Sequence, residues 1–405
     1  MVVIERPDDL GRLSGTKKWL LVYGRRKTGK TFLIENFMKY DEYFFVRRDG
    51  GLISKVGEKT IAYDTFTEIL KRALADDKTV VVDEFHRLGG EFFDLLHYMK
   101  KQGRLILVSS TLYLSRQMFS SHSPLLGLFA ETPITLISLK DTLKAAEKLT
   151  NDNKQRLELA KLLREPLSVE YLDPKKDPRK ILADILSSSA QTIPALVGEI
   201  FTEEERHTSA VYEGILRAVA DGRVVSGEIS SQLFSKKLIK KDDPSVIQQY
   251  LANLIRFGIL RRIEVFGKKR YIYKHVSPLA RLYYYADEKY NISERRPSDA
   301  EMQRIIDNIM PRLVEDNIRE YLAEKHNLKE TVIEAADYEV DACLLRFQKP
   351  EIAVEVKWKQ QITPKDLQEA EDKLQKTEAK TRILFVQDKK NIPPTKLQIN
   401  DPIDL

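Results

Sequence analysis

Cysteine is almost absent from this chain of 405 residues, and it has no long apolar run. The single cysteine, Cys343, excludes an internal disulfide framework and a cysteine-rich zinc site, and it fits a reducing cytoplasm. No apolar run approaches the length of a membrane span, and Met1–Arg6 lacks the pattern of a signal peptide. We therefore expect a cytoplasmic protein with no membrane partner.

Basic and acidic residues are nearly balanced. The chain has 67 Lys and Arg against 61 Asp and Glu, which gives a formal net charge of +6. This excess permits a polyanionic partner such as DNA but does not require one. With 42% apolar and 32% charged residues, the composition is that of a soluble globular protein. The length suggests about two to four domains.

The most informative stretch of the sequence is a phosphate-binding loop. The apolar run Trp19–Tyr23 precedes it and the helix-like segment Phe32–Met38 follows it, which is the strand–loop–helix context that the motif requires. In such a loop, backbone N–H groups and a helix N-terminus face the phosphates. Lys30 is expected to reach the β- and γ-phosphates, and the Thr31 hydroxyl to ligate Mg²⁺. The residues predicted to bind a nucleoside triphosphate here are Gly24, Arg25, Arg26, Lys27, Thr28, Gly29, Lys30, Thr31 and Phe32.

A second motif ends a β-branched run. Thr79–Glu84 reads Thr-Val-Val-Val-Asp-Glu, which is typical of a buried parallel strand whose carboxyl end faces a ligand. Asp83 is predicted to hold Mg²⁺ through water, and Glu84 to orient or deprotonate the attacking water. The alternative is that the acidic pair caps a helix.

A third apolar run, Arg104–Val108, leads into the hydroxyl residues Ser109, Ser110 and Thr111. A hydroxyl at the end of a strand either contacts the γ-phosphate or caps the next helix. Both interpretations stay open from the pattern alone.

Four regions follow one another along the chain, which predicts a multidomain α/β protein. Residues 1–139 alternate short strands with helical patterns, as in a P-loop ATPase core with a parallel sheet, and residues 140–208 read as a helical lid. Residues 209–292 read as a winged helix-turn-helix, and residues 293–405 as a C-terminal α/β domain. The core strands are expected at Trp19–Tyr23, Tyr43–Val46, Thr79–Val82, Arg104–Val108 and Ile134–Ile137.

The third predicted helix of the winged unit, Ser245–Gly258, has one apolar and one polar side. The polar side and its surroundings either contact DNA or form a solvated basic face on a module that packs against the ATPase and transmits its state. The polar and basic residues concerned are Gln248, Gln249, Asn253 and Arg256 on the helix, Lys236, Lys237, Lys240 and Lys241 before it, and Arg261, Arg262, Lys268, Lys269 and Arg270 around the hairpin.

A second candidate site lies near the C-terminus. Asp341 stands near the start of one predicted strand, and Glu355 and Lys357 lie two residues apart on the next. Period-two geometry puts Glu355 and Lys357 on one face, and hairpin pairing brings Asp341 alongside. Two carboxylates and an ammonium suit a phosphodiesterase that uses Mg²⁺, with Mn²⁺ as an alternative, in which the carboxylates hold the metal. The alternative is a cross-strand ladder of salt bridges without chemistry.

Two further expectations concern this site. The predicted helix Pro311–His326 carries Glu315, which either completes the metal site or is an ordinary surface glutamate. Ile352, Val354 and Val356 alternate with the charged residues, so the carboxylates are expected to face a cleft or solvent.

These motifs together resemble the archaeal ATPase family. Leu21–Thr31 is similar to the family's P-loop, Val82–His86 to its Asp-Glu-Phe strand end, and Ser123–Gly127 to its Ser-Pro-Leu-Tyr-Gly stretch. Val340–Asp341 and Glu355–Lys357 look like the PD-(D/E)XK nuclease-type domain that many of these ATPases carry and that archaeal Holliday-junction resolvases share. The resemblance covers nearly the whole chain.

The resemblance implies a switch of the STAND group, which is AAA+-like in architecture and hydrolyses ATP slowly and under regulation. It implies a DNA partner and leaves room for a homo-oligomer. The C-terminal domain would either cleave DNA or only grip nucleic acid or protein, and a scaffold that never contacts DNA is a further alternative. The chain departs from the family pattern at two places. Leu128 and Phe129 follow Gly127 where arginines are frequent, and Ser109-Ser110 replaces Gly-Ser, which favours Ser110 as the γ-phosphate sensor.

Overall fold

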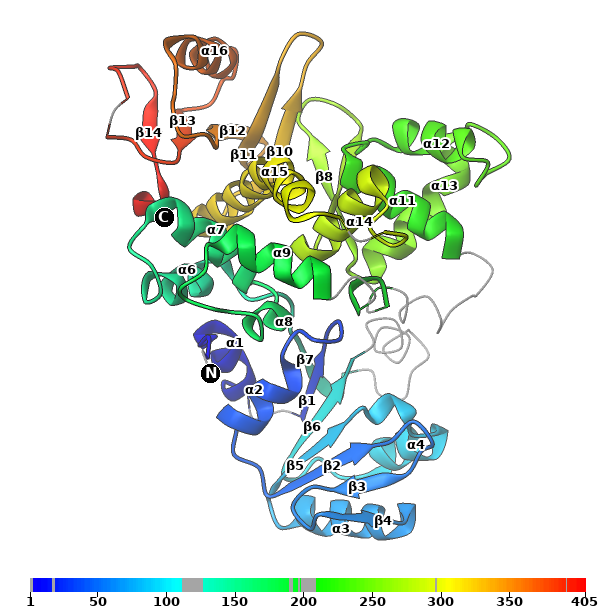
Figure 1. Ribbon diagram of the computed structural model, residues 1–405. Coiled ribbons are helices and arrows are strands. Elements are labelled where there is room, and N and C mark those ends of the chain that lie inside the picture. The colour runs from blue at the N-terminus through cyan, green and yellow to red at the C-terminus, as the bar shows by residue number, and fades with distance from the viewer. Residues whose placement is uncertain are drawn as a thin grey trace. The chain divides into compact units, whose positions relative to one another are not determined.

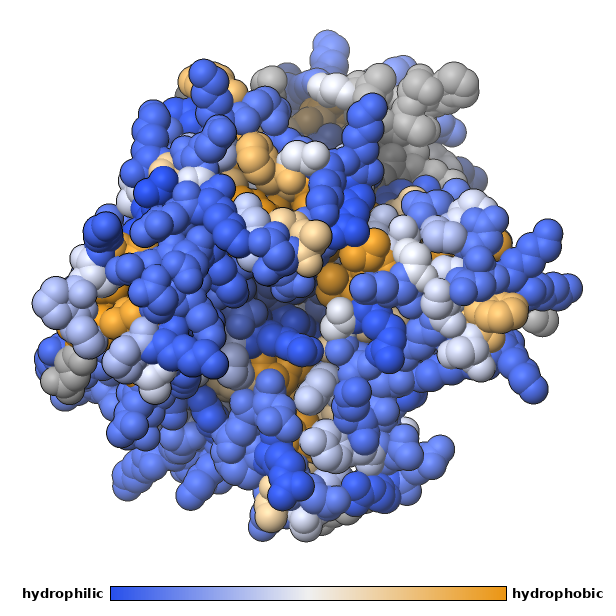
Figure 2. All heavy atoms as spheres, turned by 90° about the horizontal axis from the view of Figure 1, so that it is seen from above, coloured by the Kyte–Doolittle hydropathy of each residue, from blue (hydrophilic) through white to orange (hydrophobic). Residues whose placement is uncertain are grey.

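The computed structural model describes residues 3–16, 19–110, 127–188, 192–195, 197, 209–295, 297–390 and 392–405. They belong to two compact units, Glu5–Leu136 and a second made of Met1–Ile4 with Ile137–Leu405 (Figure 1). Hydrophilic side chains cover most of the surface in the view of Figure 2, as the share of charged residues leads one to expect. Among the residues that the structure places, no helix has both the length and the hydropathy needed to cross a bilayer.

The N-terminal unit is built on one seven-stranded sheet in the order β4-β3-β2-β5-β6-β1-β7. Strands β2, β5, β6, β1 and β7 are parallel to their neighbours, and β3 and β4 extend the sheet antiparallel beyond β2. The bounds are β1 Trp19–Tyr23, β2 Glu42–Val46, β3 Leu52–Ser54, β4 Lys59–Ile61, β5 Thr79–Asp83, β6 Arg104–Ser109 and β7 Phe129–Pro133.

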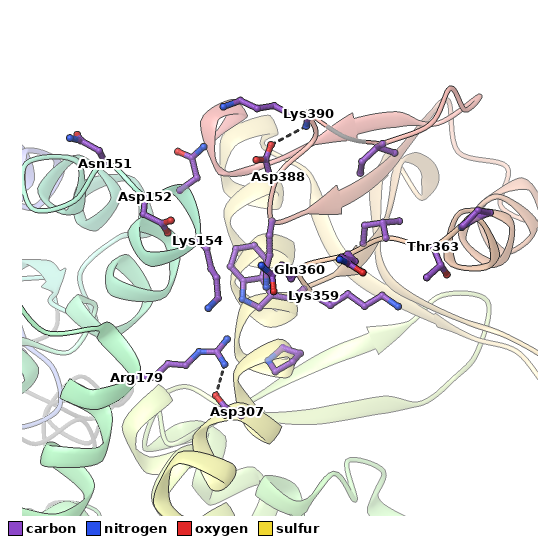
Figure 3. A pocket seen from close by; sticks show the side chains of 18 residues that line it. Asn151, Asp152, Lys154, Arg179, Asp307, Lys359, Gln360, Thr363, Asp388 and Lys390 are labelled. Carbon is purple, nitrogen blue, oxygen red and sulfur yellow. Dashed lines mark hydrogen bonds and ion pairs between the residues drawn. The ribbon is translucent and has the colours of Figure 1, made fainter. Parts of the chain in front are cut away.

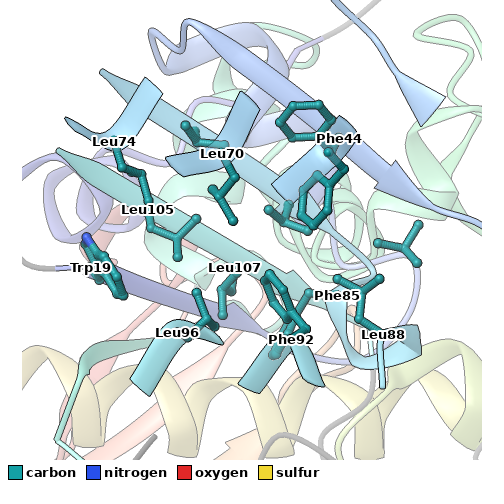
Figure 4. Packing of buried hydrophobic residues seen from close by; sticks show 14 of the residues in the cluster. Trp19, Phe44, Leu70, Leu74, Phe85, Leu88, Phe92, Leu96, Leu105 and Leu107 are labelled. Atoms are coloured by element: carbon teal, nitrogen blue, oxygen red, sulfur yellow. The ribbon is translucent and has the colours of Figure 1, made fainter. Parts of the chain in front are cut away.

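Helices cover both faces of this sheet, so its central strands are apolar on both sides. On one face Leu21 and Leu107 pack with Leu70 and Phe92, as Figure 4 shows for part of this cluster. On the other face Leu20, Val22 and Ile106 pack with Leu13, Leu33 and Ile34. The helices are α1 Pro7–Ser14, α2 Lys30–Phe37, α3 Tyr63–Ala75 and α4 Gly90–Tyr98, with a short 3-10 helix, η1, at Phe85–Arg87.

Four of the five strands predicted for this core are confirmed, and the fifth is wrong. The last strand is Phe129–Pro133 and not Ile134–Ile137. It pairs with β1 from Trp19 to Tyr23, and β1 offers no further residue for pairing because it ends there. Ile134 and Ile137 are buried, so their apolar character reflects burial in the connection to the next helix.

The C-terminal unit holds a second seven-stranded sheet in the order β14-β13-β12-β11-β10-β8-β9. The hairpin β8–β9 was expected to belong to a separate domain, but β8 pairs in parallel with β10 at Glu264↔Thr331 and Val265↔Val332. The bounds are β8 Leu260–Val265, β9 Tyr271–His275, β10 Lys329–Glu334, β11 Glu339–Arg346, β12 Lys349–Lys357, β13 Thr381–Val386 and β14 Gln398–Asn400. The domain boundaries proposed from the sequence stay predictions.

Helices are present in each of the segments predicted as lid, winged unit and tail, but these domain assignments stay predictions. Part of the predicted lid, and Ser123–Leu126 of the family-like stretch, lie outside the described residues. The helix predicted at Pro311–His326 begins twelve residues earlier, at Asp299, because a capping box between Ser298 and Glu301 starts it and Pro311 is accommodated inside. The bounds are α6 Leu139–Glu147, α7 Asn153–Leu163, α8 Pro166–Val169, α9 Pro178–Ser188, α11 Ser209–Asp221, α12 Ser226–Ser235, α13 Pro244–Arg256, α14 Pro278–Tyr290, α15 Asp299–His326 and α16 Pro364–Gln375, with a 3-10 turn, η3, at Pro402–Asp404.

Buried charged groups on α15 tie the parts of this unit together. Asp316 is paired with Arg281 of α14, Arg319 of its own helix and Lys274 of β9. Burial by itself raises the pKa of Asp316, but these three cations outweigh burial and hold the pKa well below its usual value. The carboxylate therefore stays ionised and binds the hairpin side of the unit to α15.

A second group of polar contacts joins α15 to the helical region. Arg164, which follows α7, donates to Glu320 at 2.6 Å and to Asn317 at 3.0 Å. Lys161 donates to the same Asn317 oxygen at 2.7 Å, and burial lowers the pKa of Lys161 to about 7. Glu330 connects β10 to the same helix and to the hairpin, because it accepts hydrogen bonds from Arg319 of α15 and Arg261 of β8, both at 2.7 Å.

We expect Asp316→Asn to lower the free energy of unfolding of the C-terminal unit by about 3–5 kcal/mol, because the change leaves buried cations without their counter-charge. The chain has two tryptophans, Trp19 in one unit and Trp358 in the other. In a Trp19→Phe background, the fluorescence of Trp358 during urea unfolding therefore reports the C-terminal unit alone.

The control is Asp307→Asn, because Asp307 is exposed and its partner Arg179 keeps Glu158; a loss below about 1 kcal/mol is expected. The pKa of Asp316 is depressed in the folded protein, so its contribution is present above the unfolded pKa and lost as the pH falls through the folded pKa. The difference between wild type and Asp316→Asn should therefore shrink below about pH 4. Equal losses in the two variants at pH 7 would contradict the assignment.

Candidate functional sites

The phosphate-binding loop leaves β1 at Tyr23 and enters α2 at Lys30. Its backbone takes left-handed conformations at Lys27, with φ of 60°, and at Gly29, with φ of 87°. Gly24 cannot carry a side chain, because a Cβ atom there would lie 2.0 Å from the carbonyl oxygen of Ile134. The loop is thus curled against the residue that follows β7. Buried Arg6 also contacts the loop, because it donates to the carbonyl oxygen of Thr28 at 2.8 Å.

Lys30 lies folded back onto the loop. Its ammonium donates to the carbonyl oxygens of Gly24 at 2.9 Å and Arg25 at 2.7 Å, and the side chain is buried. Burial lowers the pKa of Lys30 to about 8, although the charges of Glu84 and Asp83 oppose the shift. The ammonium is therefore held by the loop carbonyls, and the nearby carboxylates offset part of the cost of its burial.

Thr31 and Asp83, the predicted metal ligands of this unit, lie together. Asp83 Oδ2 accepts from Thr31 Oγ1 at 3.0 Å and from the Tyr43 hydroxyl at 2.8 Å, and Oδ1 accepts from the Glu84 amide at 2.9 Å. Burial raises the pKa of Asp83, while the hydrogen bond from Tyr43 opposes the rise. A hydroxyl and a carboxylate oxygen at one point suit Mg²⁺, which prefers oxygen ligands. Tyr43 was not identified from the sequence. It lies on β2, and no sequence motif predicts that β2 pairs with β5.

Glu84 is held by three neighbours. Its Oε2 accepts from the Ser110 hydroxyl at 2.8 Å, and it lies 3.2 Å from Arg87 and 3.5 Å from His86. Glu84 has a positive φ of 57° and stands at the N-cap of η1, but its side chain makes no capping hydrogen bond. The helix-cap interpretation of this glutamate is therefore wrong. Burial lowers the pKa of His86 to about 4, so the ring is neutral at pH 7.

Two other predictions for this site have different outcomes. Ser110 contacts Glu84, and the residues that would show whether it also caps a helix lie outside the described part of the chain.

Phe32 is 39% exposed and packs edge-to-face on Phe37, with 6.1 Å between the ring centroids. Arg25 and Arg26 are half-buried and Lys27 is exposed. Their roles in nucleotide binding stay predictions.

The C-terminal candidates converge from α15, β11 and β12. Lys357 Nζ lies 3.1 Å from Glu355 Oε1, so the predicted common face of these two residues is confirmed. Asp341 Oδ2 accepts from the Val356 amide at 2.8 Å. Burial raises the pKa of Asp341 well above its usual value, and the charges of Glu315 and Glu355 raise it further. Glu315 is half-buried and close enough to act on Asp341, which excludes an ordinary surface glutamate.

The expectation that these carboxylates face a cleft or solvent is wrong for Glu355. Its side chain is 3% exposed, because α16 covers this part of the sheet and Lys373 of α16 reaches Glu355 Oε1 at 2.7 Å. Lys373 was not predicted from the sequence. It stands beside the core residue Leu374 in a helix whose position depends on long-range packing, and no motif includes it.

The donor set at this second site has the chemistry for a hard divalent cation. Glu355 Oε2 is buried and has no hydrogen-bond partner among the described residues, so one carboxylate oxygen is available at the centre of the site. Within the described part of the chain, however, no three His, Cys, Asp or Glu side chains are arranged as a ready metal site. Two lysines supply the positive charge that accompanies the carboxylates.

A polar groove of about 1160 Å³ begins next to this site. It lies at the carboxyl ends of the parallel strands β12 and β13, where α/β sheets commonly bind ligands. In Figure 3 Asp152 and Lys154 lie on one side of the groove and Gln360 and Lys359 on the other, and the ion pair of Arg179 and Asp307 lies below them in the view. Its lining includes Asn151, Asp152, Lys154, Trp358, Lys359, Gln360, Thr363, Asp388 and Lys390.

We expect Gly24→Ala to weaken ATP binding at least about tenfold, or roughly 1.4 kcal/mol. The added methyl group meets the Ile134 carbonyl oxygen at 2.0 Å, so the loop must move. Titration with a fluorescent ATP analogue measures the effect. Gly89→Ala is the matched control, because no atom lies within 4 Å of its Cβ position, and it should bind as wild type does. Unchanged affinity in Gly24→Ala would show that the loop does not grip phosphate in this conformation.

Comparison with known proteins agrees with this geometry in the N-terminal unit. Residues 16–142 match the family model described as "AAA domain". The Walker-type ATPase of Pyrococcus abyssi is structurally similar, with a TM-score of 0.51 and 18% identity over 70% of this chain and 96% of that one. No curated protein sequence matches the chain.

Two further structures align at lower similarity. The ORC2 protein of Aeropyrum pernix in its ADPNP–ADP complexes has a TM-score of 0.37 and 14% identity over 78% of this chain and 95% of that one. The STAND protein PH0952 of Pyrococcus horikoshii has a TM-score of 0.30 and 14% identity over 79% of this chain and 51% of that one. These two likenesses are too distant to carry an inference. The family match and the parallel sheet together show a P-loop ATPase-like core in which residues 16–142 are similar to an AAA domain.

Proposed function

We propose that the protein is a Mg²⁺-dependent ATP-hydrolysing switch coupled to a DNA-binding or DNA-cleaving C-terminal unit. The observation that carries the first half is the joint position of Lys30, Thr31, Asp83 and Glu84 at the carboxyl ends of β1 and β5. The observation that carries the second half is the convergence of acidic and basic groups from α15, β11 and β12.

In the ATPase unit, each side chain has a defined task. Lys30 and the loop amides bind the phosphates, and Thr31 and Asp83 hold Mg²⁺, which supplies charge neutralisation for the transferred phosphoryl group. Glu84 orients the attacking water, and Ser110 lies beside it. Arg87 and Ser110 both engage Oε2 of Glu84 in the present structure, so this oxygen must exchange these contacts for water before it acts. That requirement supports slow, regulated hydrolysis and not continuous turnover.

In the tail, the order α15-β10-β11-β12-α16-β13 supports a PD-(D/E)XK-type domain. Glu315, Asp341 and Glu355 would hold Mg²⁺ or Mn²⁺, which would activate water toward a phosphodiester. Lys357 would orient that water or stabilise the developing charge. Glu355 Oε2, buried and unpaired among the described residues, supports this assignment because it is an oxygen that a metal ion could take as a ligand.

DNA contact by the proposed winged helix would use fewer residues than the sequence suggests. Arg261 is paired with Glu330 and Arg270 with Glu334, both on β10, so these two cations are neutralised by the tail. Lys268 and Lys269 in the turn between β8 and β9 remain exposed.

The proposed regions are the ATPase core at 1–139, the lid at 140–208, the winged helix at 209–292 and the nuclease-like domain at 293–405.

A second candidate function is an ATP-controlled scaffold whose tail only binds nucleic acid or protein. The observation that favours it is the pairing of β8 with β10, which builds the hairpin into the tail sheet and covers the β8 edge of the hairpin. Cleavage and binding assays distinguish the two functions.

The cleavage test uses labelled linear, single-stranded and branched DNA with Mg²⁺ or Mn²⁺, with and without ATP. Wild type should cut at least one substrate, and Glu355→Gln and Lys357→Ala should lower the rate at least about 100-fold, because each removes a group that acts at the reacting phosphodiester. Lys349→Ala is the matched control, since Lys349 is exposed at the far end of β12. Lys30→Ala shows whether ATP controls the cut. Intact ATPase activity without cutting of any substrate would favour the scaffold.

The binding test compares the double variant Lys268→Glu/Lys269→Glu with wild type over a range of salt concentrations. If the turn contacts phosphates, the slope of log affinity against log salt concentration should fall in magnitude by about 2. Lys175→Glu/Lys176→Glu makes the same charge change at another exposed pair in this unit and should leave the slope unchanged. Equal slopes in all three proteins would remove the hairpin from the DNA interface.

A further inference from the structure

Two lysines share one oxygen of Glu355. Lys357 Nζ lies 3.1 Å and Lys373 Nζ 2.7 Å from Oε1, whereas Oε2 is buried and unpaired within the described part of the chain. Lys357 follows Glu355 on the same strand, but Lys373 comes from α16, on a different element of the unit. The shorter of the two contacts therefore belongs to the residue that no motif predicts.

The position of Lys373 is fixed by the packing of its helix. Leu367, Ala370 and Leu374 of α16 are buried in the same cluster as Ala353 of β12 and Leu384 of β13. Lys373 precedes Leu374, so its side chain leaves the helix at the border of this cluster and remains 30% exposed. It can swing between Glu355 and solvent without disturbing the apolar contacts of the helix.

The charges explain what Lys373 does in this arrangement. Glu315, Asp341 and Glu355 carry three acidic groups into a poorly solvated region, and such groups need counter-charge. Lys357 and Lys373 provide part of it. A divalent cation that binds Glu355 through Oε2, the oxygen without a partner among the described residues, would lie close to the ammonium that is 2.7 Å from Oε1, and the two positive charges would repel each other.

We propose that Lys373 is a positioning residue that guards the carboxylate site: its ammonium, held on Oε1 of Glu355, opposes the binding of a divalent cation at Oε2 and moves toward solvent when the cation binds. Metal binding is thereby weakened while Lys373 contacts Glu355, and it becomes dependent on the position of α16. This inference rests on the proposed metal-dependent tail. A purely structural role, in which Lys373 only attaches α16 to β12, predicts lower stability on its removal and no gain in metal affinity.

The test is titration of Mn²⁺ into the nucleotide-free full-length protein, followed by electron paramagnetic resonance of the free ion. Glu355→Gln defines the part of the binding that belongs to this site. Lys373→Gln should bind Mn²⁺ about tenfold more tightly than wild type in that part, because a competing cation is gone. Lys373→Arg keeps the cation and should stay within about twofold of wild type. Thermal melting in the absence of metal checks that each variant is folded.

Lys376→Gln is the matched control. Lys376 lies one turn further on, is paired with Asp337 at 2.6 Å and is exposed, so its removal should leave Mn²⁺ affinity unchanged. Glu355-dependent binding that is equal in wild type and Lys373→Gln would overturn the guarding role and leave the proposed metal site in place. If neither protein, nor Lys373→Arg, shows binding that depends on Glu355, the proposed metal chemistry of the tail itself is overturned.

Discussion

The burial of charged side chains is the constraint on which both units depend. An ionised group taken out of water is costly unless close partners compensate it, and each candidate site consists of such groups. Lys30 is compensated by loop carbonyls and by the charges of Glu84 and Asp83, and Glu355 by two ammonium groups. The partners of these residues also fix where their side chains point, so stability and chemistry have the same origin here.

In the C-terminal unit this constraint makes α15 the centre of the structure. Asp316 holds cations from β9 and α14, and Asn317 and Glu320 hold Lys161 and Arg164 of the helical region. Glu315, on the same helix, acts on the candidate carboxylate site. Helical, hairpin and tail segments that the sequence presents as successive modules are therefore connected through one helix. A shift of α15 would be felt at Glu315 and in the hairpin together, which offers a route for coupling inside this unit.

In both candidate sites the acidic side chain is already bound by other side chains of the protein. Glu84 is engaged by Ser110 and Arg87, and Glu355 by Lys357 and Lys373, so in each case the acidic group expected to take part in chemistry has protein partners. Contacts of this kind are exchanged when a ligand or metal competes for the same oxygen. Such a resting state is compatible with a switch, in which the groups are assembled in advance and released by binding.

The sequence by itself determined the phosphate-binding loop, the strand that ends at Asp83 with Glu84 directly after it, and the common face of Glu355 and Lys357. These features are local: glycines at a tight curl, carboxylates at a strand end and a two-residue period are dictated by backbone geometry over a few residues. Only the tertiary structure decided the contacts of Tyr43 with Asp83 and of Lys373 with Glu355, the end of the core sheet at Pro133, and the joining of β8 to β10. Those depend on which distant segments pack together, and apolar periodicity shows that a residue is buried without showing what it is buried against.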